Sequence, residues 1–375
     1  MTGFSEKEHL RYTRHIQLPG VGIDGQQKLK QAQVLIIGCG GLGAPVSYYL
    51  AAAGVGKLTL VDADTVDLSN LQRQIIYTEN DIGKPKASCS QQRLKQLNSD
   101  ISIDAVCESL TPTNAVELIS DADLVLDCTD NFNTRYLIND ACKALGKYWL
   151  YASVYQFSGQ CALFSPGGSC FRCLFPSAPI DAPDCNAAGV LGVLPGLLGT
   201  LQATEALRFL LGLPTAIENN LMLIETETLQ FQKMALQTKA SCLCCQKGFN
   251  FNLHKYDHTD YKPVCSSDKP VDTASINAEQ FDALCQRDDI QLIDVRDDNE
   301  RAAFHLGGEH IPLAKINCET FDCSLLDKQK TLLLYCQSGV RSQLARDILL
   351  DKNLKALSII GGIAQILKCR QNHNR

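Results

Sequence analysis

The sequence has no cluster of basic residues and no uninterrupted apolar stretch of the length that crosses a membrane. Its net charge of -6 and its pI near 5.7 argue against a general binder of nucleic acids or membrane surfaces. The first ten residues are polar and lack the apolar core of a signal peptide. The most hydrophobic window, residues 189–213, is interrupted by Pro195, Gln202, Glu205 and Arg208. We therefore expect a cytoplasmic protein with neither nucleic acid nor membrane as a partner.

Disulfides are not expected in such a reducing compartment, although the chain has 18 cysteines. Cysteines of a cytoplasmic protein bind metals, catalyse reactions or fill the core. The last use is predicted for four that lie in apolar surroundings, namely Cys107, Cys128, Cys142 and Cys161. The length of 375 residues predicts about two domains.

The stretch from 33 to 64 predicts a βαβ unit that can bind phosphate. An apolar strand runs into Gly38-x-Gly40-x-x-Gly43, a helix of small residues follows, and a second strand ends at Asp62. The glycines let backbone N–H groups approach an anion, and the helix N-terminus favours negative charge. The Asp62 carboxylate is placed to bind ribose hydroxyls. This unit alone fits an NAD-dependent dehydrogenase as well as an enzyme that uses ATP.

Polar residues follow two of the predicted strands. Asp62 and Asp64 suit ribose and Mg²⁺, and Arg73 and Lys86 are cations that can hold phosphate oxygens. Asp130 follows another strand and is a candidate carboxylate for a metal or phosphate site. Ligands of doubly wound sheets bind at the carboxyl ends of the strands, which is where these residues are expected.

Strands and helices alternate through this half of the chain. Strands are predicted at 101–106, 123–127 and 149–152, and helices at 84–98, 114–119 and 135–145. Such alternation predicts an α/β fold, with a Rossmann-like, mainly parallel sheet covered on both faces.

Two CxxC pairs, Cys170 with Cys173 and Cys242 with Cys245, indicate a zinc site. Four thiolates complete a tetrahedral shell, so this zinc is expected to be structural and to join two distant segments. Two redox-active pairs are the alternative, but no thioredoxin-like context surrounds them. Cys244 lies inside the second pair and is not assigned to the metal.

Two single cysteines are candidate nucleophiles. Cys185 lies in a loop rich in Pro and Asp that precedes a helix. Cys336 ends an apolar strand, and the loop that follows it opens a helix and contains Gly339 and Arg341. Loop N–H groups and the arginine would stabilise a thiolate or a persulfide there.

The segment 249–274 has no clear periodicity and is predicted to be a linker. We therefore expect one domain at 1–248 and a second, small α/β domain at 275–375.

The first domain resembles the MoeB/ThiF adenylyltransferases, relatives of ubiquitin-activating enzymes. The resemblance rests on Arg11-Tyr-x-Arg14, Val34–Gly43, Asp62-x-Asp64, Ser69-Asn70-Leu71-x-Arg73-Gln74, Gly83-x-Pro85-Lys86, Asp127-Cys-Thr-Asp130-Asn131, both CxxC pairs and Cys185-x-x-x-Gly189-Val190. It implies a homodimer that binds ATP and Mg²⁺. It also implies adenylation of the C-terminal glycine of a small β-grasp sulfur carrier ending in Gly-Gly.

The resemblance also implies roles for single residues. Those that would hold ATP are Gly38, Gly40, Gly41, Gly43, Asp62, Asp64, Ser69, Asn70, Arg73, Lys86 and Asn131, while Asp130 would hold Mg²⁺. Arg14 would reach the phosphates from the other subunit.

The second domain resembles a rhodanese through Asp294-Val295-Arg296, the loop from Cys336 to Arg341 and the late Gly361-Gly362. A loop of this length suits sulfur transfer, whereas related phosphatases use a longer one. The usual Gly-His-Ile-x-Gly-Ala pattern is altered here to residues 304–309. The resemblance implies a persulfide on Cys336, with a cysteine desulfurase as a candidate donor.

Together the two resemblances predict an enzyme that turns the carrier's C-terminus into a thiocarboxylate. A Cys336 persulfide would attack the acyl-adenylate, and Cys185 would release the product or form a thioester first. Molybdopterin synthesis is the favoured pathway. Thiamine synthesis, tRNA thiolation and a Rossmann-type NAD enzyme stay open as alternatives.

Overall fold

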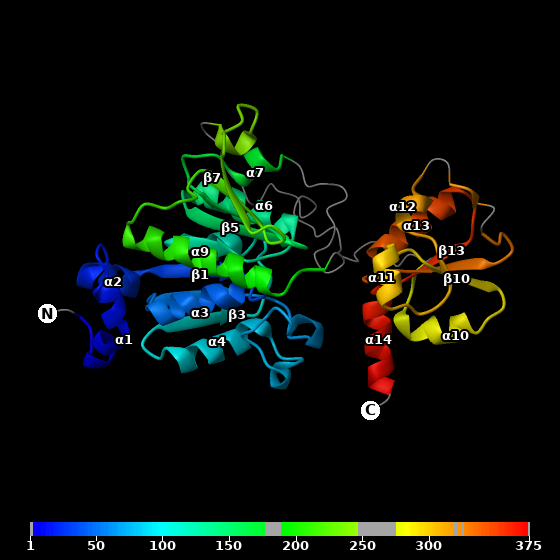
Figure 1. Cartoon of the computed structure of the whole chain (residues 1–375), viewed down its shortest axis with the longest axis horizontal. Coiled ribbons are helices and arrows are strands. Elements are labelled where there is room, and N and C mark those ends of the chain that lie inside the picture. Colours follow the sequence, from blue (N-terminus) through cyan, green and yellow to red (C-terminus); the bar gives the residue numbers. More distant parts are fainter. Residues whose placement is uncertain (1–2, 177–188, 247–274, 319–320, 324–325, 374–375) are drawn as a thin grey trace. The chain divides into compact units, whose positions relative to one another are not determined.

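The computed structural model of the chain describes residues 3–176, 189–246, 275–318, 321–323 and 326–373. The chain divides into two compact units, residues 1–263 and 264–375, each with its own sheet (Figure 1). The predicted linker, 249–274, lies outside the described residues. Among the helices of the described ranges, none is both long and apolar enough to span a lipid bilayer.

The first unit is built on an eight-stranded sheet in the order β3-β2-β1-β4-β5-β6-β7-β8. Neighbours from β3 to β5 are parallel, and the pairs from β5 to β8 are antiparallel. The strands are β1 (Gln33–Ile37), β2 (Lys57–Val61), β3 (Ser102–Val106), β4 (Leu124–Asp127), β5 (Tyr148–Tyr155), β6 (Ser158–Phe164), β7 (Asn220–Glu225) and β8 (Gln230–Ala235). The predicted Rossmann-like, mainly parallel sheet is therefore confirmed, and the antiparallel end is an addition to it.

Helices cover both faces of this sheet (Figure 1). They are α1 (Glu6–Ile16), α2 (Gly22–Gln31), α3 (Gly43–Ala53), α4 (Lys86–Leu97), α5 (Ala115–Ser120), α6 (Phe132–Leu145), α7 (Phe171–Leu174) and α9 (Val193–Leu211). In β1, Val34 and Ile36 join the core under α3, α4 and α9, whereas Leu35 and Ile37 join the core under α5 and α6. Because both faces are covered, β1 reads as an unbroken apolar run.

Three of the four cysteines predicted to fill the core do so, since Cys128, Cys142 and Cys161 are buried. The prediction for Cys107 is wrong. Cys107 is exposed on the segment after β3, where its Sγ lies 3.1 Å from the hydroxyl of Ser88. The apolar residues before it belong to the strand and say little about the loop that follows.

The second unit contains a five-stranded sheet in the order β11-β10-β12-β13-β9, with parallel pairing throughout. Its strands are β9 (Ser275–Ile276), β10 (Ile290–Asp294), β11 (Glu309–His310), β12 (Thr331–Tyr335) and β13 (Ala356–Ile359). Its helices are α10 (Phe281–Cys285), α11 (Asp298–Ala303), α12 (Leu313–Ile316), α13 (Val340–Asp351) and α14 (Gly362–His373). At the end of β10, Asp294 and Arg296 form a buried ion pair at 2.7 Å. The prediction of a small α/β domain in this part of the chain is therefore confirmed.

Candidate active sites

A pocket of about 260 Å³ opens at the carboxyl ends of β1, β2 and β4. From β1 the chain runs outward to β2 and β3 and then returns to β4 on the other side, so the strand order reverses here. Such a reversal leaves a crevice in which doubly wound sheets bind ligands. Nine predicted site residues line it: Gly38, Gly40, Gly41, Asp62, Asp64, Arg73, Lys86, Asp130 and Asn131.

The glycine loop is shaped by close contacts of the backbone. Gly38 has φ of +95°, and a Cβ there would lie 2.6 Å from the carbonyl oxygen of Cys128. A Cβ on Gly43 would lie 2.1 Å from the carbonyl oxygen of Gly38. Gly43 is therefore required for the turn and does not itself line the pocket, whereas Gly40 and Gly41 do.

The carboxylate of Asp62 is fixed by backbone donors. Oδ2 accepts a hydrogen bond from the N–H of Cys39 at 2.7 Å, and Oδ1 accepts one from the N–H of Asp64 at 2.8 Å. Burial raises the pKa of Asp62 above its ordinary value, and these hydrogen bonds and Lys86 only partly offset that effect. Asp62 therefore ties the glycine loop to the end of β2 at the position predicted for ribose binding.

Lys86 provides a fixed cation in the pocket wall. The residue is 6% exposed, and its Nζ donates a hydrogen bond to Oδ2 of Asp64 at 2.8 Å. Lys86 also lines the pocket, and its ammonium group has N–H donors beyond the one that binds Asp64, so it can contact a further anion. A cation held in this way suits phosphate oxygens.

Arg73 follows a 3₁₀ turn, Leu68–Asn70, and its Nη1 donates to the carbonyl oxygen of Ser69 at 3.1 Å. The Ser69 hydroxyl donates to Asp67 at 2.7 Å, and the N–H of Arg73 donates to the carbonyl oxygen of Asn70 at 3.1 Å. Ser69 and Asn70 are not part of the lining formed by the described residues. In this structure they shape the turn that carries Arg73, and their contact with a nucleotide stays a prediction.

Asp127, at the end of β4, is fully buried and organises the segment that follows. Its Oδ1 accepts hydrogen bonds from the N–H and the hydroxyl of Thr129, at 2.9 and 2.7 Å. Its Oδ2 lies 3.5 Å from Nε of Arg135, whose Nη2 donates to the carbonyl oxygen of Thr129 at 2.7 Å. Burial raises the pKa of Asp127 to about 6, although the charge of Arg135 opposes this shift.

This arrangement presents Asp130 and Asn131 at the pocket. The side chain of Asn131 accepts a hydrogen bond from the N–H of Thr134 at 2.9 Å and so caps α6. The helix therefore begins at Phe132, three residues before the predicted start at Arg135. Asp130 directly precedes this cap residue and lines the pocket.

Other residues that line the pocket were not predicted as site residues: Gln74, Glu108, Ser109, Leu110, Thr129, Thr134, Arg135, Val154, Val190 and Pro195. A signal was available for 108–110, because these residues follow β3 and thus another strand end at the same edge of the sheet. Gln74 is buried, and its Oε1 has no hydrogen-bond partner among the described residues. Val190 and Pro195 come from a distant part of the chain, so local patterns do not reveal them.

Besides Gly43, Ser69 and Asn70, two further predicted residues are not part of this pocket in the described part of the chain. Arg14 is exposed on α1 and does not line the pocket. Cys185 lies outside the described residues.

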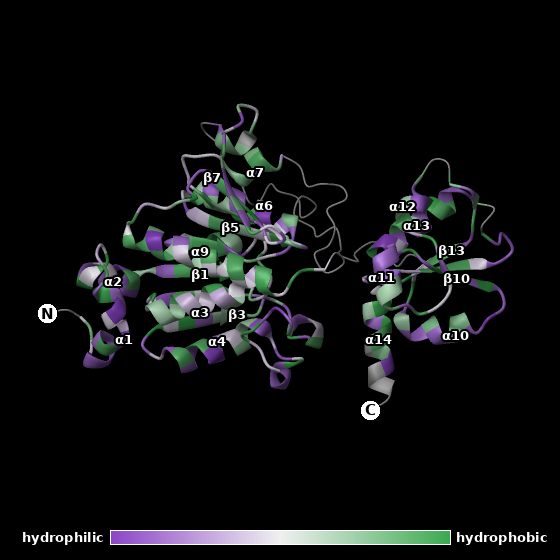
Figure 2. Ribbon diagram, in the orientation of Figure 1, coloured by the Kyte–Doolittle hydropathy of each residue, from purple (hydrophilic) through white to green (hydrophobic). Residues whose placement is uncertain are grey.

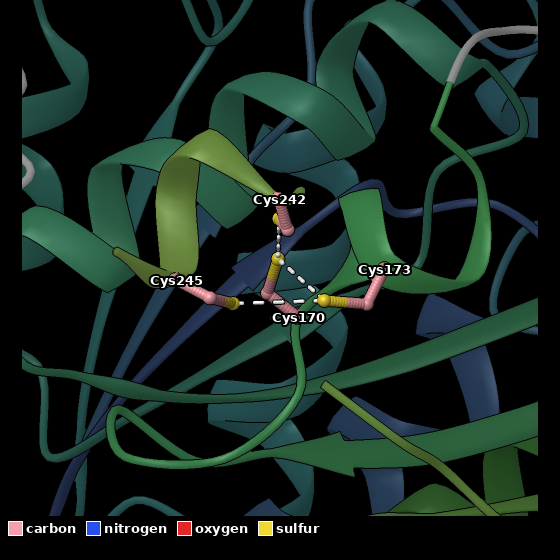
Figure 3. A group of neighbouring side chains, drawn as sticks. All are labelled: Cys170, Cys173, Cys242 and Cys245. Atoms are coloured by element: carbon pink, nitrogen blue, oxygen red, sulfur yellow. Dashed lines mark hydrogen bonds between the residues drawn. The ribbon is translucent and has the colours of Figure 1, made fainter. Parts of the chain in front are cut away.

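The two CxxC pairs come together in a buried cluster (Figure 3). Sγ of Cys170 lies 3.5 Å from Sγ of Cys242 and 3.9 Å from Sγ of Cys173, and the sulfurs of Cys173 and Cys245 are 3.6 Å apart. Hydrogen bonds from neighbouring thiols, Cys244 first, lower the pKa of Cys170 to about 5. The cluster is thus able to hold a metal ion. Cys244 also donates a hydrogen bond to Asp140, at 3.3 Å, and is not one of the four residues of the set, as expected.

The second unit places Cys336 between the end of β12 and the start of α13. Its buried Sγ accepts hydrogen bonds from the N–H groups of Gly339, at 3.1 Å, and Ser342, at 3.4 Å. Gly339 has φ of +92°, and a Cβ on Gly362 would lie 2.2 Å from the carbonyl oxygen of Cys336. The paired glycines therefore hold the loop closely, and its N–H groups surround the sulfur as predicted. Such donors at a helix N-terminus favour negative charge on sulfur.

The fold and the two sites define a class of protein. One unit has a nucleotide-type pocket at the strand reversal of a doubly wound sheet and a cysteine cluster able to hold a metal. The other has a cysteine held in a loop of backbone donors at a helix N-terminus.

Comparison with protein families assigns both units. Residues 12–245 match the ThiF family, and residues 277–369 match the rhodanese-like domain. The chain belongs to the ThiF family and carries a C-terminal rhodanese-like domain. It is therefore an enzyme of the adenylyltransferase class with a sulfurtransferase domain, and the dehydrogenase alternative is not supported.

Two curated relatives match nearly the whole chain, and a third matches about two thirds of it. The chain is 34% identical to a probable molybdopterin-synthase adenylyltransferase of Porphyra purpurea, over 97% of this chain and 94% of that one. It is 35% identical to the adenylyltransferase and sulfurtransferase MOCS3 of Anopheles gambiae, over 97% and 87%. A sulfur carrier protein ThiS adenylyltransferase of Escherichia coli is 46% identical over 64% of this chain and 96% of that one.

Among solved structures, the fold resembles Escherichia coli MccB, determined with ATP. The TM-score is 0.56 at 25% identity, over 64% of this chain and 75% of that chain.

Proposed function

We propose that this enzyme uses ATP to adenylate the C-terminal glycine of a small β-grasp sulfur carrier and then replaces the activating group with sulfur from Cys336. The observation that carries the proposal is the presence, in one chain, of a pocket lined by cationic and carboxylate side chains and of a cysteine whose Sγ accepts two backbone N–H hydrogen bonds. Relatives named as activators of sulfur carriers support it. Molybdopterin synthesis is the favoured pathway because of the full-length relative named for it.

In the proposed complex, Gly41 and its neighbours hold the phosphates by their N–H groups, and Asp62 holds the ribose. Lys86 and Arg73 contact phosphate oxygens, with Arg14 of a second subunit of a homodimer completing the cations. The carboxylate of Asp130 fits Mg²⁺, which prefers oxygen ligands and would offset the charge of the phosphates. The carrier's carboxylate oxygen attacks the α-phosphorus, and pyrophosphate leaves. Positioning and charge supply most of the catalysis.

In the second half-reaction, the outer sulfur of a Cys336 persulfide attacks the acyl carbon, and AMP leaves. The resulting acyl disulfide is opened by the thiolate of Cys185, which frees the thiocarboxylate and leaves a disulfide between the two cysteines. A cellular thiol must then reduce that disulfide. A thioester on Cys185, formed before the persulfide acts, is the alternative order.

A cysteine desulfurase is proposed as the source of the persulfide, and the cytoplasm as the compartment. Residues 249–274 are proposed to link the domains at 1–248 and 275–375.

The proposal is tested by weighing a carrier that ends in Gly-Gly after incubation with the enzyme, ATP–Mg²⁺ and a persulfide donor. We expect a product in which one sulfur replaces one oxygen, and only when ATP is present. A carrier that gains AMP but never sulfur would limit the function to adenylation. A carrier that is not modified at all would contradict the proposal.

We propose Zn²⁺ for the cysteine cluster. A tetrahedral ion with Zn–S bonds of about 2.3 Å separates its sulfurs by roughly 3.8 Å. The sulfur distances of 3.5, 3.6 and 3.9 Å are close to this value, and all four sulfurs lie within 4.8 Å of one another. With four thiolates no position is left for substrate, so the metal is structural.

Replacing Cys173 with serine is expected to abolish stoichiometric zinc binding and to destabilise the first unit by about 3 kcal/mol, or ~10 °C in Tm, because one ligand of a folding site is lost. Zinc content and thermal unfolding measure this. The control is Cys107→Ser, an exposed cysteine outside the cluster, which should keep both. Full zinc content in Cys173→Ser would show that the metal, if present, lies elsewhere.

A further inference from the structure

The sulfur loop has a charge arrangement that its sequence does not reveal. The segment Cys336–Ser342 contains a single charged side chain, Arg341. Its guanidinium donates two hydrogen bonds to Glu300 on α11, from Nη1 to Oε2 at 2.6 Å and from Nη2 to Oε1 at 2.7 Å. Nη1 also lies 3.3 Å from Oδ2 of Asp297. The cation of the loop is thus matched by two carboxylates from another element.

The pair is held in place by local structure. Asp297 caps α11, and Oε2 of Glu300 accepts a hydrogen bond from the N–H of Asp297 at 3.2 Å, which completes a capping box. Hydrogen bonding to Glu300 raises the pKa of Arg341 above its usual value. Helix α11 is strongly hydrophilic (Figure 2) and buries none of its residues. Besides Glu300, its Arg301 forms hydrogen bonds with Tyr335 and with the carbonyl oxygen of Gly307.

We propose that Glu300 determines which sulfur donor the loop accepts. By neutralising Arg341, it makes the loop a poor site for a small dianion such as thiosulfate and favours a persulfide donor of lower charge. The inference rests on the proposed sulfur transfer to Cys336. Glu300 acts through Arg341 and is therefore a specificity residue rather than a catalytic one.

The charge balance of the two reactions explains the preference. In both, the Cys336 thiolate attacks the outer sulfur of the donor, and the donor's S–S bond breaks. Thiosulfate releases sulfite, which takes the electron pair and carries two negative charges. A persulfide releases a thiolate with one. An unpaired guanidinium would stabilise the sulfite as it forms, but here Glu300 and Asp297 already occupy it.

The test is Glu300→Gln in the full chain. Glutamine has the same shape and can keep the capping box and one hydrogen bond to Arg341, while the negative charge is lost. We expect the KM for thiosulfate to fall by about tenfold, as removal of a close compensating charge predicts. The KM for cysteine persulfide should change by less than about twofold on the same grounds. Sulfur acceptance is followed as the mass of the Cys336 persulfide.

Asp298→Asn is the matched control, because it removes a charge from the same helix at a side chain that is 89% exposed and pairs with His310 instead. It should leave both KM values unchanged. Asp297→Asn, which can still cap the helix, should lower the KM for thiosulfate by a smaller factor and tests the idea if Glu300→Gln fails to fold.

Three outcomes decide against the inference. An unchanged KM for thiosulfate in both the Glu300 and the Asp297 variants would show that Glu300 does not determine the donor, and it would leave the proposed function intact. Equal falls in KM for both donors would show a general effect on the loop. If Cys336 of the unaltered protein accepts sulfur from neither donor, the proposed function itself is wrong.

Discussion

Replacing Cys336 with alanine is expected to abolish thiocarboxylate formation and to leave ATP–pyrophosphate exchange within about twofold of the unaltered enzyme, since the exchange uses no nucleophilic sulfur. In the proposed mechanism, the two reactions use different units of the chain. The Cys336 sulfur is surrounded by N–H groups of its own loop, and the nucleotide pocket is lined by residues of the first unit. Exchange is measured with labelled pyrophosphate, and thiocarboxylate by the mass of the carrier.

Alanine at this position removes one buried sulfur, which accepts hydrogen bonds from the N–H groups of Gly339 and Ser342. A loss of stability of about 1–3 kcal/mol is therefore expected, and thermal unfolding establishes that the variant is folded before the reactions are compared. Cys285→Ala is the control, since Cys285 is an exposed cysteine of the same unit and should keep both reactions. Loss of exchange in a folded Cys336→Ala variant would contradict the division of labour between the units.

The reciprocal change is Lys86→Met. We expect exchange to fall by about 10²- to 10³-fold, because a preorganised cation that meets developing phosphate charge is worth several kcal/mol. Methionine keeps the apolar stem that is buried in the pocket wall but removes the ammonium group that pairs with Asp64 at 2.8 Å. Acceptance of sulfur by Cys336 should be unaffected.

Lys84→Met is its control. Lys84 lies two positions away, outside the pocket lining, and pairs with Asp81 at 3.9 Å. Exchange should be normal in this variant. Normal exchange in Lys86→Met as well would show that the ammonium group does not act on the phosphates, and the proposed nucleotide geometry would have to be abandoned.

The parallel part of the fold could be predicted because its signals are local. The apolar run of β1, the glycine turn and the strand-end residues Asp62 and Asp130 all lie within short segments, and the sheet brings their ends to one edge. The same holds for Cys336, where a strand, a loop and a helix are contiguous. The altered segment 304–309 is still anchored, since Tyr335 and Arg301 hydrogen-bond to the carbonyl oxygen of Gly307.

The remaining features depend on contacts between distant segments. Strand β8 is exposed along its whole length, so it has no alternating apolar pattern, and the antiparallel end of the sheet was missed. The pairing of Glu300 with Arg341 joins residues 41 positions apart. The sequence shows Asp127 only as part of a motif. In the structure it is buried and accepts hydrogen bonds from Thr129, which fixes the segment that carries Asp130.

The cysteine cluster also bears on the wall of the nucleotide-type pocket. Its two pairs lie 72 positions apart, and the chain between them includes α9. Pro195 of α9 packs against Gly41 in the pocket, and Gln202 donates to the carbonyl oxygen of Asp127 at 2.9 Å. A bound ion would join the two ends of this stretch and so restrict the position of α9, which forms one wall of the pocket. If the ion favours the arrangement of this wall that binds nucleotide, thermodynamic reciprocity requires bound nucleotide to favour retention of the ion to the same degree.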